Sequence, residues 1–264
     1  MKGILALVSA IFILVNISSC AENKAAQIPE PFSKSSFIRE TEAENENEYL
    51  SIEHSVFYNP DYTADEVFAY FKEVVLSSEY TENVENSGLV QKWILPIYYI
   101  IEGDHSDEDK RIITDFINEL NQIDGFPGMY PVENGKRPNF VMNFMSSGEL
   151  MQKMGSAVNF ERSDGISQFW FLLRVNVICG AKIGYDKSMS NAVRPAVLLE
   201  EIVNAIGISN DTETRKDSIV YSEYTETDHL SEMDWLILRI LYSDQIKCGM
   251  NEDECYAAIK SIYY

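Results

Sequence analysis

The stretch "RPAVLLEEIVNAIGISND", residues 194–211, decides how the rest of the chain is interpreted. Its apolar residues recur at helical spacing, Pro195 suits the first turn of a helix, and Gly207 suits its end. We therefore expect a helix with one apolar side. On such a helix Glu200 and Asn204 project from the same face, one turn apart, and Glu201 stands beside them.

The spacing of these polar residues is that of the zinc hydrolase motif H-E-x-x-H, which is extended in some enzymes to H-E-x-x-H-x-x-G-x-x-H/D. In that motif two imidazoles hold the metal, and the intervening Glu handles the proton of the attacking water. The residues at the motif positions here are, in order, Glu200, Glu201, Asn204, Gly207 and then Asn210 or Asp211. The frame of the motif is kept, but both imidazoles are replaced.

Three interpretations of this stretch stay open. An active enzyme would be a metallohydrolase with Glu201 as the catalytic base, and its metal ligands would be Glu200, Asn204, Asn210, Asp211 and His229. Zinc prefers Cys, His and carboxylate ligands, so this oxygen-rich set suits a hard ion such as calcium better. Alternatively, the acidic residues are polar positions of a half-exposed helix, and Asn210 and Asp211 cap its end. In the third interpretation, the cleft of a protease fold persists and binds a peptide or glycan without cutting it.

Residue patterns elsewhere predict the fold around this helix. Helices are expected at 59–80, 106–125, 230–242 and 251–264, and strands at 90–104, 137–146 and 168–186. Capping pairs mark two helix starts, Thr63 with Glu66 and Ser231 with Asp234. Pro96 suggests an edge strand or a bulge, and Gly180 and Gly184 suggest that 168–186 turns back near them. We place the folded domain at residues 56–264 and expect an α+β class.

Several blocks of the sequence resemble a known family. These blocks are "YFKEVVLSSEY", "VQKWILPIYYIIEG", "LLEEIVNAIGISND", "DSIVYSEY" and "LSEMDWLILRILYSDQIKCGM". In this order they resemble a bacterial family of exported proteins of unknown function with a zincin-like domain. The matching positions are Glu200, Glu201, Asn204, Gly207, Asn210, Asp211, Asp234, Leu238, Arg239, Leu241, Tyr242, Gly249 and Met250. The resemblance covers the chain from about residue 65 to its end.

The resemblance implies a metzincin-like architecture. In it, a twisted mixed sheet packs on the motif helix, and a smaller helical part follows at the C-terminus. Met233 or Met250 would correspond to the methionine turn that lies beneath the metal in active relatives. The resemblance brings no established activity with it.

The N-terminus predicts export. Lys2 precedes an apolar run from Ile4 to Val15 that is too short to span a membrane, and "ISSC" follows at residues 17–20. This pattern resembles a bacterial lipobox. It predicts a signal peptide at 1–19 and a lipidated Cys20 whose acyl chains hold the protein to a membrane. The alternative is an ordinary signal peptide cut near Ser19.

The polar segment that follows, residues 20–55, carries an acidic run and too few apolar residues to form a core, so we expect a flexible tether. The whole chain has 42 acidic and 21 basic residues, a formal charge of -21. Such a charge repels a nucleic-acid backbone, so nucleic-acid binding is excluded as the main function. The acidic run around His105, which includes Asp104 and Asp109, is interpreted as a favourable helix start.

The remaining cysteines and histidines carry weaker signals. Cys248 and Cys255 are seven residues apart with Gly249 between them, so a small disulfide loop is plausible in an export compartment. Cys179 lies in an apolar run, where we expect a buried thiol. His54 has no partner that the sequence identifies.

The leading hypothesis is a lipoprotein of the bacterial cell envelope with a zincin-like domain that does not catalyse. It would need no cofactor and would bind a peptide, protein or glycan of the envelope. The first alternative is a metal-dependent hydrolase that uses zinc or calcium around Glu200, Glu201 and Asp211. The second is a solute-binding lipoprotein.

Overall fold

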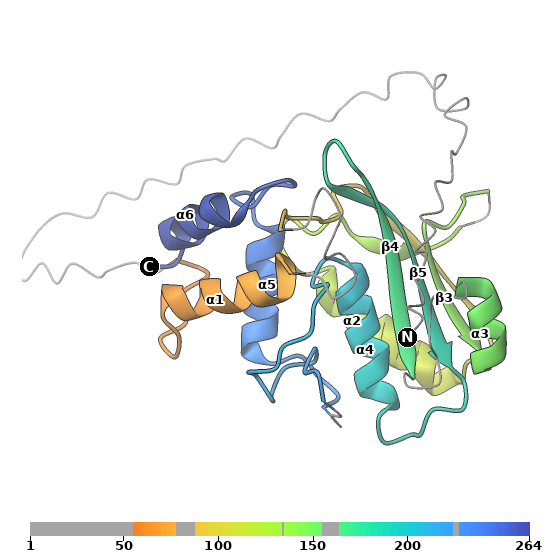
Figure 1. The fold of residues 1–264 in the computed structure, drawn as a ribbon. Coiled ribbons are helices and arrows are strands. Elements are labelled where there is room, and N and C mark those ends of the chain that lie inside the picture. Colours follow the sequence, from red (N-terminus) through yellow and green to blue (C-terminus); the bar gives the residue numbers. More distant parts are fainter. Residues whose placement is uncertain (1–54, 78–87, 134, 155–163, 224–226) are drawn as a thin grey trace, which may run out of the picture. The chain divides into compact units, whose positions relative to one another are not determined.

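The computed structural model describes residues 55–77, 88–133, 135–154, 164–223 and 227–264 (Figure 1). The expected signal peptide, Cys20, the acidic tether and His54 lie outside the described residues. The description below concerns the unit formed by residues 51–264. None of its described helices has both the length and the apolar character needed to cross a membrane.

Five strands form one mixed sheet in the order β2-β1-β3-β5-β4. The strands are β1 (Ile97–Gly103), β2 (Met129–Pro131), β3 (Phe140–Met145), β4 (Gly165–Leu172) and β5 (Val177–Asp186). All neighbouring strands are parallel except β4, which is an antiparallel edge strand beside β5. The described residues also form six helices, so the chain has a mixed α/β fold.

The helices are α1 (Ala64–Val75), α2 (Asp107–Leu120), α3 (Ser147–Met154), α4 (Arg194–Ala205), α5 (Glu232–Tyr242) and α6 (Glu252–Ile262). Helix α4 contains the motif and lies against β4, β5 and α2. Phe144 and Tyr185 stack on this face of the sheet with their ring centroids 4.8 Å apart. Met145, the next residue of β3, points to the other face by the alternation of a strand and packs with Leu150 and Met154 of α3. Helix α3 therefore covers part of the face opposite α4.

A buried ion pair fixes the start of the motif helix. Val193, the N-cap of α4, makes no side-chain capping bond. Instead, the Arg194 guanidinium donates to both carboxylate oxygens of Asp109 at 3.2 Å and to the Lys187 carbonyl oxygen at 2.8 Å. Asp109 is fully buried and forms the capping box of α2 with Ser106, as the acidic helix start predicts. The two helix starts are thus held together.

The C-terminal helices join the same core. Helix α1 contacts α5 and α6, and the buried residues of all three belong to the cluster that also lines the sheet. Lys92 links the two parts, because its buried ammonium donates to the carbonyl oxygens of Leu241 at 2.7 Å and Ile246 at 2.6 Å. The ammonium therefore satisfies carbonyls where α5 ends.

Two predictions about the strands are wrong in detail. Pro96 marks neither an edge strand nor a bulge, because it immediately precedes β1, and the first strand residue, Ile97, donates to the Gly128 carbonyl oxygen. Gly180 and Gly184 lie inside β5, and the hairpin turns instead at residues 173–176. There Asn176 adopts a φ of 53°, a left-handed conformation that Asn tolerates better than most residues.

Candidate functional site

The motif helix α4 brings Glu201 against the edge strand β4. Glu201 is only 7% exposed. A Cβ atom added to Gly165 of β4 would come within 2.8 Å of its Oε1 atom, and within 2.6 Å of Val197 Cγ1. The absence of a side chain at Gly165 therefore allows α4 to approach β4 closely, and it places the Glu201 carboxylate beside the backbone of the edge strand.

The neighbouring motif positions are partly exposed. Glu200 and Asn204 lie on the same face of α4, one turn apart. The Asn204 Oδ1 atom is buried and has no hydrogen-bond partner in the described part of the chain. An orphaned buried acceptor of this kind is uncommon in folded proteins and marks a position where a donor would be stabilising.

Tyr185 lies beneath these carboxylates. Its hydroxyl donates to the Leu198 carbonyl oxygen at 2.9 Å. Burial raises the pKa of Tyr185 well above its usual value, and the charges of Glu201 and Glu200 raise it further. Tyr185 therefore stays protonated at neutral pH and serves as a fixed donor under α4.

The proposed third ligands lie at a different place. The Asn210 side-chain amide donates to the carbonyl oxygens of Glu73 at 3.0 Å and Asp211 at 2.9 Å. The backbone N–H groups of Ser209 and Asn210 donate to the Val74 carbonyl oxygen. Asn210 therefore completes the end of α1, and its side chain does not cap α4.

His229 is not part of a metal-binding group either. Its side chain is exposed and its Nδ1 atom lies 2.9 Å from Asp228 Oδ1. Among the described residues, no three or more His, Cys, Asp or Glu side chains are grouped so that they could hold a metal ion. The residues at the motif positions do not fit zinc, because the carboxylate of Glu200 and the amide of Asn204 stand where the motif requires imidazole ligands.

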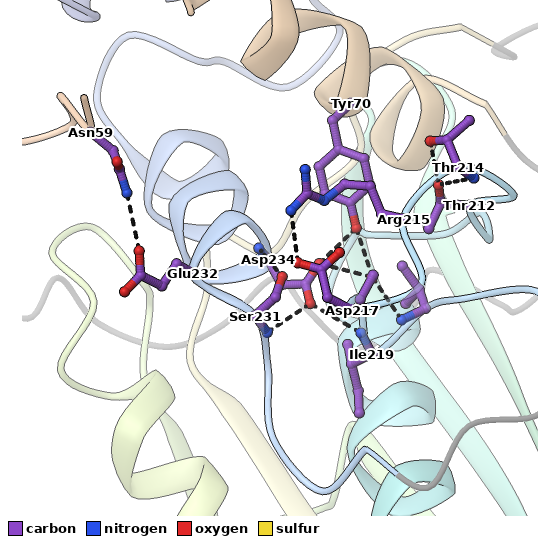
Figure 2. A network of polar contacts seen from close by, with 12 residues as sticks. Asn59, Tyr70, Thr212, Thr214, Arg215, Asp217, Ile219, Ser231, Glu232 and Asp234 are labelled. Carbon is purple, nitrogen blue, oxygen red and sulfur yellow. Dashed lines mark hydrogen bonds and ion pairs between the residues drawn. The ribbon is translucent and has the colours of Figure 1, made fainter. Parts of the chain in front are cut away.

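Sequence reasoning missed a buried network around Asp234, which Figure 2 shows. The Asp234 carboxylate is 1% exposed and accepts hydrogen bonds from the Tyr70 hydroxyl at 2.6 Å and the Ser218 hydroxyl at 2.9 Å. It also accepts from the backbone N–H groups of Ile219 and Ser231, both at 3.0 Å. The sequence shows only the local pair of Ser231 with Asp234, because the other partners come from distant segments.

Arg215 extends this network. Its guanidinium lies over the rings of Tyr62 and Tyr70, at 5.4 and 5.5 Å from their centroids, and pairs with Asp217 at 2.8 Å. Burial raises the pKa of the Tyr70 hydroxyl, as does the Asp234 charge, so that hydroxyl remains a donor. The network holds the segment between α4 and α5 against α1, and its role is structural.

The three cysteines of the described region are free thiols. The expected disulfide between Cys248 and Cys255 is not formed, and Cys248 Sγ donates instead to the Lys92 carbonyl oxygen at 3.7 Å. Cys179 is exposed, so the prediction of a buried thiol is wrong. Its side chain alternates with the buried Ile178 on β5 and points away from the core.

No described strand pairs with the outer side of β4. Asp186 donates to the Asp164 carbonyl oxygen at 2.8 Å, which makes these two residues a hydrogen-bonded pair of the antiparallel ladder. Because such pairs alternate along the ladder, the N–H and C=O groups of Ser167 and Phe169 point away from β5.

Two cavities lie elsewhere. A groove of about 690 Å³ is bordered by Trp235 and Arg239 of α5, and one of about 520 Å³ lies at the starts of α2 and α4 beside Asp109 and Arg194. Neither is lined by Glu200, Glu201 or Asn204.

The fold and the site define a mixed α/β domain in which a polar motif helix lies against an antiparallel edge strand. Residues 64–261, three-quarters of the chain, match the family described as "Protein of unknown function (DUF2927)", and the chain belongs to this family. A search of curated proteins finds no match.

Proposed function

We propose that the domain is zincin-like, has lost both motif imidazoles, and binds an extended peptide along β4 without hydrolysing it. The observation that carries this proposal is the edge strand itself. Its outer backbone groups at Ser167 and Phe169 are not paired by any described strand, and the same strand packs directly on the motif helix. The mixed sheet before α4 and the helices after it agree with the architecture that the resemblance implies.

The environment of Glu201 favours binding over hydrolysis. A general base must reach the water from which it takes a proton. Glu201 is nearly buried and lies against the backbone at Gly165. The position one turn after Glu200 carries the amide of Asn204, which cannot replace an imidazole as a zinc ligand without a large loss of affinity.

Strand addition explains how such a site would work. An extended peptide that pairs with a free strand edge gains affinity from main-chain hydrogen bonds, and nearby side chains supply its specificity. The chain carries 42 acidic against 21 basic residues, and this overall negative charge favours peptides with basic residues. We therefore assign basic extended peptides as the ligand class.

The test uses Ser167→Pro. Proline removes the outward N–H group but leaves the β4–β5 ladder intact, because that N–H does not point toward β5. In fluorescence polarisation with a library of basic peptides, we expect Ser167→Pro to weaken binding about tenfold, the effect of one lost main-chain hydrogen bond. Ser167→Ala keeps the N–H group and serves as the matched control, which should bind like the wild type.

Two results would contradict the proposal. One is binding by Ser167→Pro that equals the wild type while circular dichroism shows an intact fold. The other is cleavage of peptides by the zinc-loaded protein that is lost in Glu201→Gln, which would restore the hydrolase alternative.

We also propose that the protein is an envelope lipoprotein attached through Cys20. Lys2, the apolar run and "ISSC" support this assignment. In bacteria fed a labelled fatty acid, the wild-type chain should take up the label and fractionate with membranes, and Cys20→Ala should do neither. Label on Cys20→Ala would exclude Cys20 as the attachment site.

A further inference from the structure

The turn of the β4–β5 hairpin and two neighbouring loops form one surface, which we name the hairpin rim. It consists of residues 92–96, 136–139 and 170–176. The first two segments immediately precede β1 and β3, and the hairpin turn immediately precedes β5, so the rim lies at the amino ends of three parallel strands. Figure 1 shows the hairpin turn at this end of the sheet.

Hydrogen bonds connect the three segments. The Ile178 N–H group donates to the Lys92 carbonyl oxygen at 3.0 Å, which joins the hairpin to the first loop. The Asn139 side chain donates to the Pro96 carbonyl oxygen at 3.1 Å, which joins the first loop to the second. The rim is therefore one continuous part of the fold.

Large apolar side chains are concentrated on the rim. Six of the twelve large hydrophobic residues that are exposed in the described chain belong to it: Ile94 56%, Leu95 60%, Trp170 45%, Leu172 53%, Leu173 58% and Val175 51%. Exposed apolar residues that are scattered singly need no explanation, but a contiguous patch marks an interaction site. The rim is such a patch.

The charge of the rim is opposite to that of the chain. The chain carries 42 acidic residues, yet residues 165–185 and 88–101 contain none. Lys136, Arg137 and Arg174 are exposed there, and Lys182 Nζ lies 5.6 Å from the centre of the Trp170 ring. Of the adjoining acidic residues, Glu133 pairs with Lys136 at 3.5 Å, and Asp244 acts on the buried ammonium of Lys92. An acidic protein thus presents one basic and apolar surface.

We propose that the hairpin rim docks on the surface of an anionic lipid bilayer. Exposed leucines at a hairpin turn can enter the boundary of the acyl chains, and Trp170 suits the interface, where aromatic rings prefer to lie. The surrounding basic side chains are attracted to anionic headgroups. A second copy of the chain fits less well, because the same basic residues would face one another.

The hairpin rim would bind a bilayer independently of lipidation at Cys20. The experiment therefore measures membrane binding by the rim in a chain without Cys20. Residues 51–264 form a unit of their own, so a chain of residues 21–264 keeps the fold and lacks Cys20. The probe is vesicles of phosphatidylcholine with one third phosphatidylglycerol, compared in flotation with vesicles of phosphatidylcholine alone. We expect this chain to float with the anionic vesicles and to be released by salt.

Variants locate the contact. Leu172→Asp with Leu173→Asp should weaken binding at least about tenfold, because both residues would have to leave the acyl boundary. Arg174→Gln should weaken it about fivefold, the share of one basic residue near an anionic surface. Met151→Asp is the matched control, because Met151 is an exposed apolar residue of α3, which begins at the carboxyl end of β3. It should bind like the wild type, and circular dichroism should show the same fold for all variants.

Several results would overturn the proposal. They are no flotation with anionic vesicles at low salt, equal binding by the rim variants and the wild type, or equal losses for Met151→Asp and the rim variants. A dimer in sedimentation that disappears in the Leu172 and Leu173 variant would assign the rim to a second copy instead. A blue shift of tryptophan emission with vesicles that is absent in Trp170→Phe would support insertion of the rim.

Discussion

At the scale of single residues, Lys92 shows how a charged group is accommodated inside the domain. Burial lowers the pKa of Lys92 to about 8, below its usual 10.5. Its side chain nevertheless bridges the loop before β1 and the end of α5 through three carbonyl oxygens. Hydrogen bonds thus stabilise the charged ammonium of Lys92 in a position where desolvation disfavours the charged form.

This lowered pKa predicts a pH dependence of stability. Between about pH 8 and 10.5 the unfolded chain holds the Lys92 proton more often than the folded chain does, so stability rises with pH across that window. The free energy of unfolding gained across the whole window is about 3 kcal/mol. Burial also raises the pKa of Cys255 to about 12, which acts in the opposite sense.

The measurement is therefore the difference in the free energy of unfolding between two proteins, one with Lys92 and one without it, at each pH. Because the Lys92 charge acts on the thiols of Cys248 and Cys255, both proteins carry Cys248→Ala and Cys255→Ala. Urea unfolding at several pH values should then show that the protein with Lys92 gains stability over Lys92→Met as pH rises from 8 to 10.5. A constant difference across this range would show that the pKa of Lys92 is not lowered.

Asp234 carries a second prediction at this scale. Asp234→Asn places an amide NH₂ group among the donors that now bind the carboxylate, so buried donors lose their partners. We expect a loss of about 3 kcal/mol in the free energy of unfolding. Ser231→Ala removes only the capping bond and should cost about 1 kcal/mol in the same denaturation experiment. Equal effects of the two variants would contradict the shared network.

The residues of the motif helix were predictable to different degrees. Helical spacing correctly groups Glu200 and Asn204 on one face, because it depends on neighbours within one turn. The contact of Glu201 with Gly165 and the bond from Tyr70 to Asp234 depend on segments far apart in sequence. The periodicity of a sequence does not predict contacts between residues that are far apart in it.

At the scale of elements, the contact of α4 with β4 is the most constrained. In Gly165→Ala the new methyl group would meet Val197 and Glu201, so we expect a loss of about 1 to 3 kcal/mol in stability. Glu201→Ala removes one obstacle, and the cost of Gly165→Ala should be smaller in that background, which a double-mutant cycle measures. Gly148→Ala meets no atom within 4 Å and is the control. Additive effects of the two changes would show that Gly165 and Glu201 do not touch.

Element boundaries followed from the sequence where local chemistry decides them. Helices α1 and α5 begin at the predicted capping boxes of Thr63 and Ser231, because both partners of a capping box lie within four residues. The short elements β2 and α3 were not predicted. A strand of three residues has no measurable period, and β2 exists because β1 provides its pairing edge.

At the scale of the whole folded unit, one core connects the sheet to the C-terminal helices. Trp93 lies 1% exposed in that core, and its indole donates to the Ala205 carbonyl oxygen at 3.0 Å, at the end of α4. Because a single hydrophobic cluster includes residues of the sheet and of α1, α5 and α6, we expect one cooperative unfolding transition. Far-ultraviolet circular dichroism and tryptophan fluorescence should give the same midpoint. Two separated transitions would show that the helical part unfolds on its own.

Strand β4 carries both the proposed peptide edge and one arm of the hairpin rim. Ser167 and Leu172 are five residues apart on it, about 17 Å at the rise of a strand. If the rim rests on a bilayer, a peptide paired at Ser167 is held at a fixed height just above the headgroups. The partners within reach would then be proteins whose extended segments emerge close to the membrane. The length of strand β4 between Ser167 and Leu172 would select partners by the distance of their extended segments from the membrane.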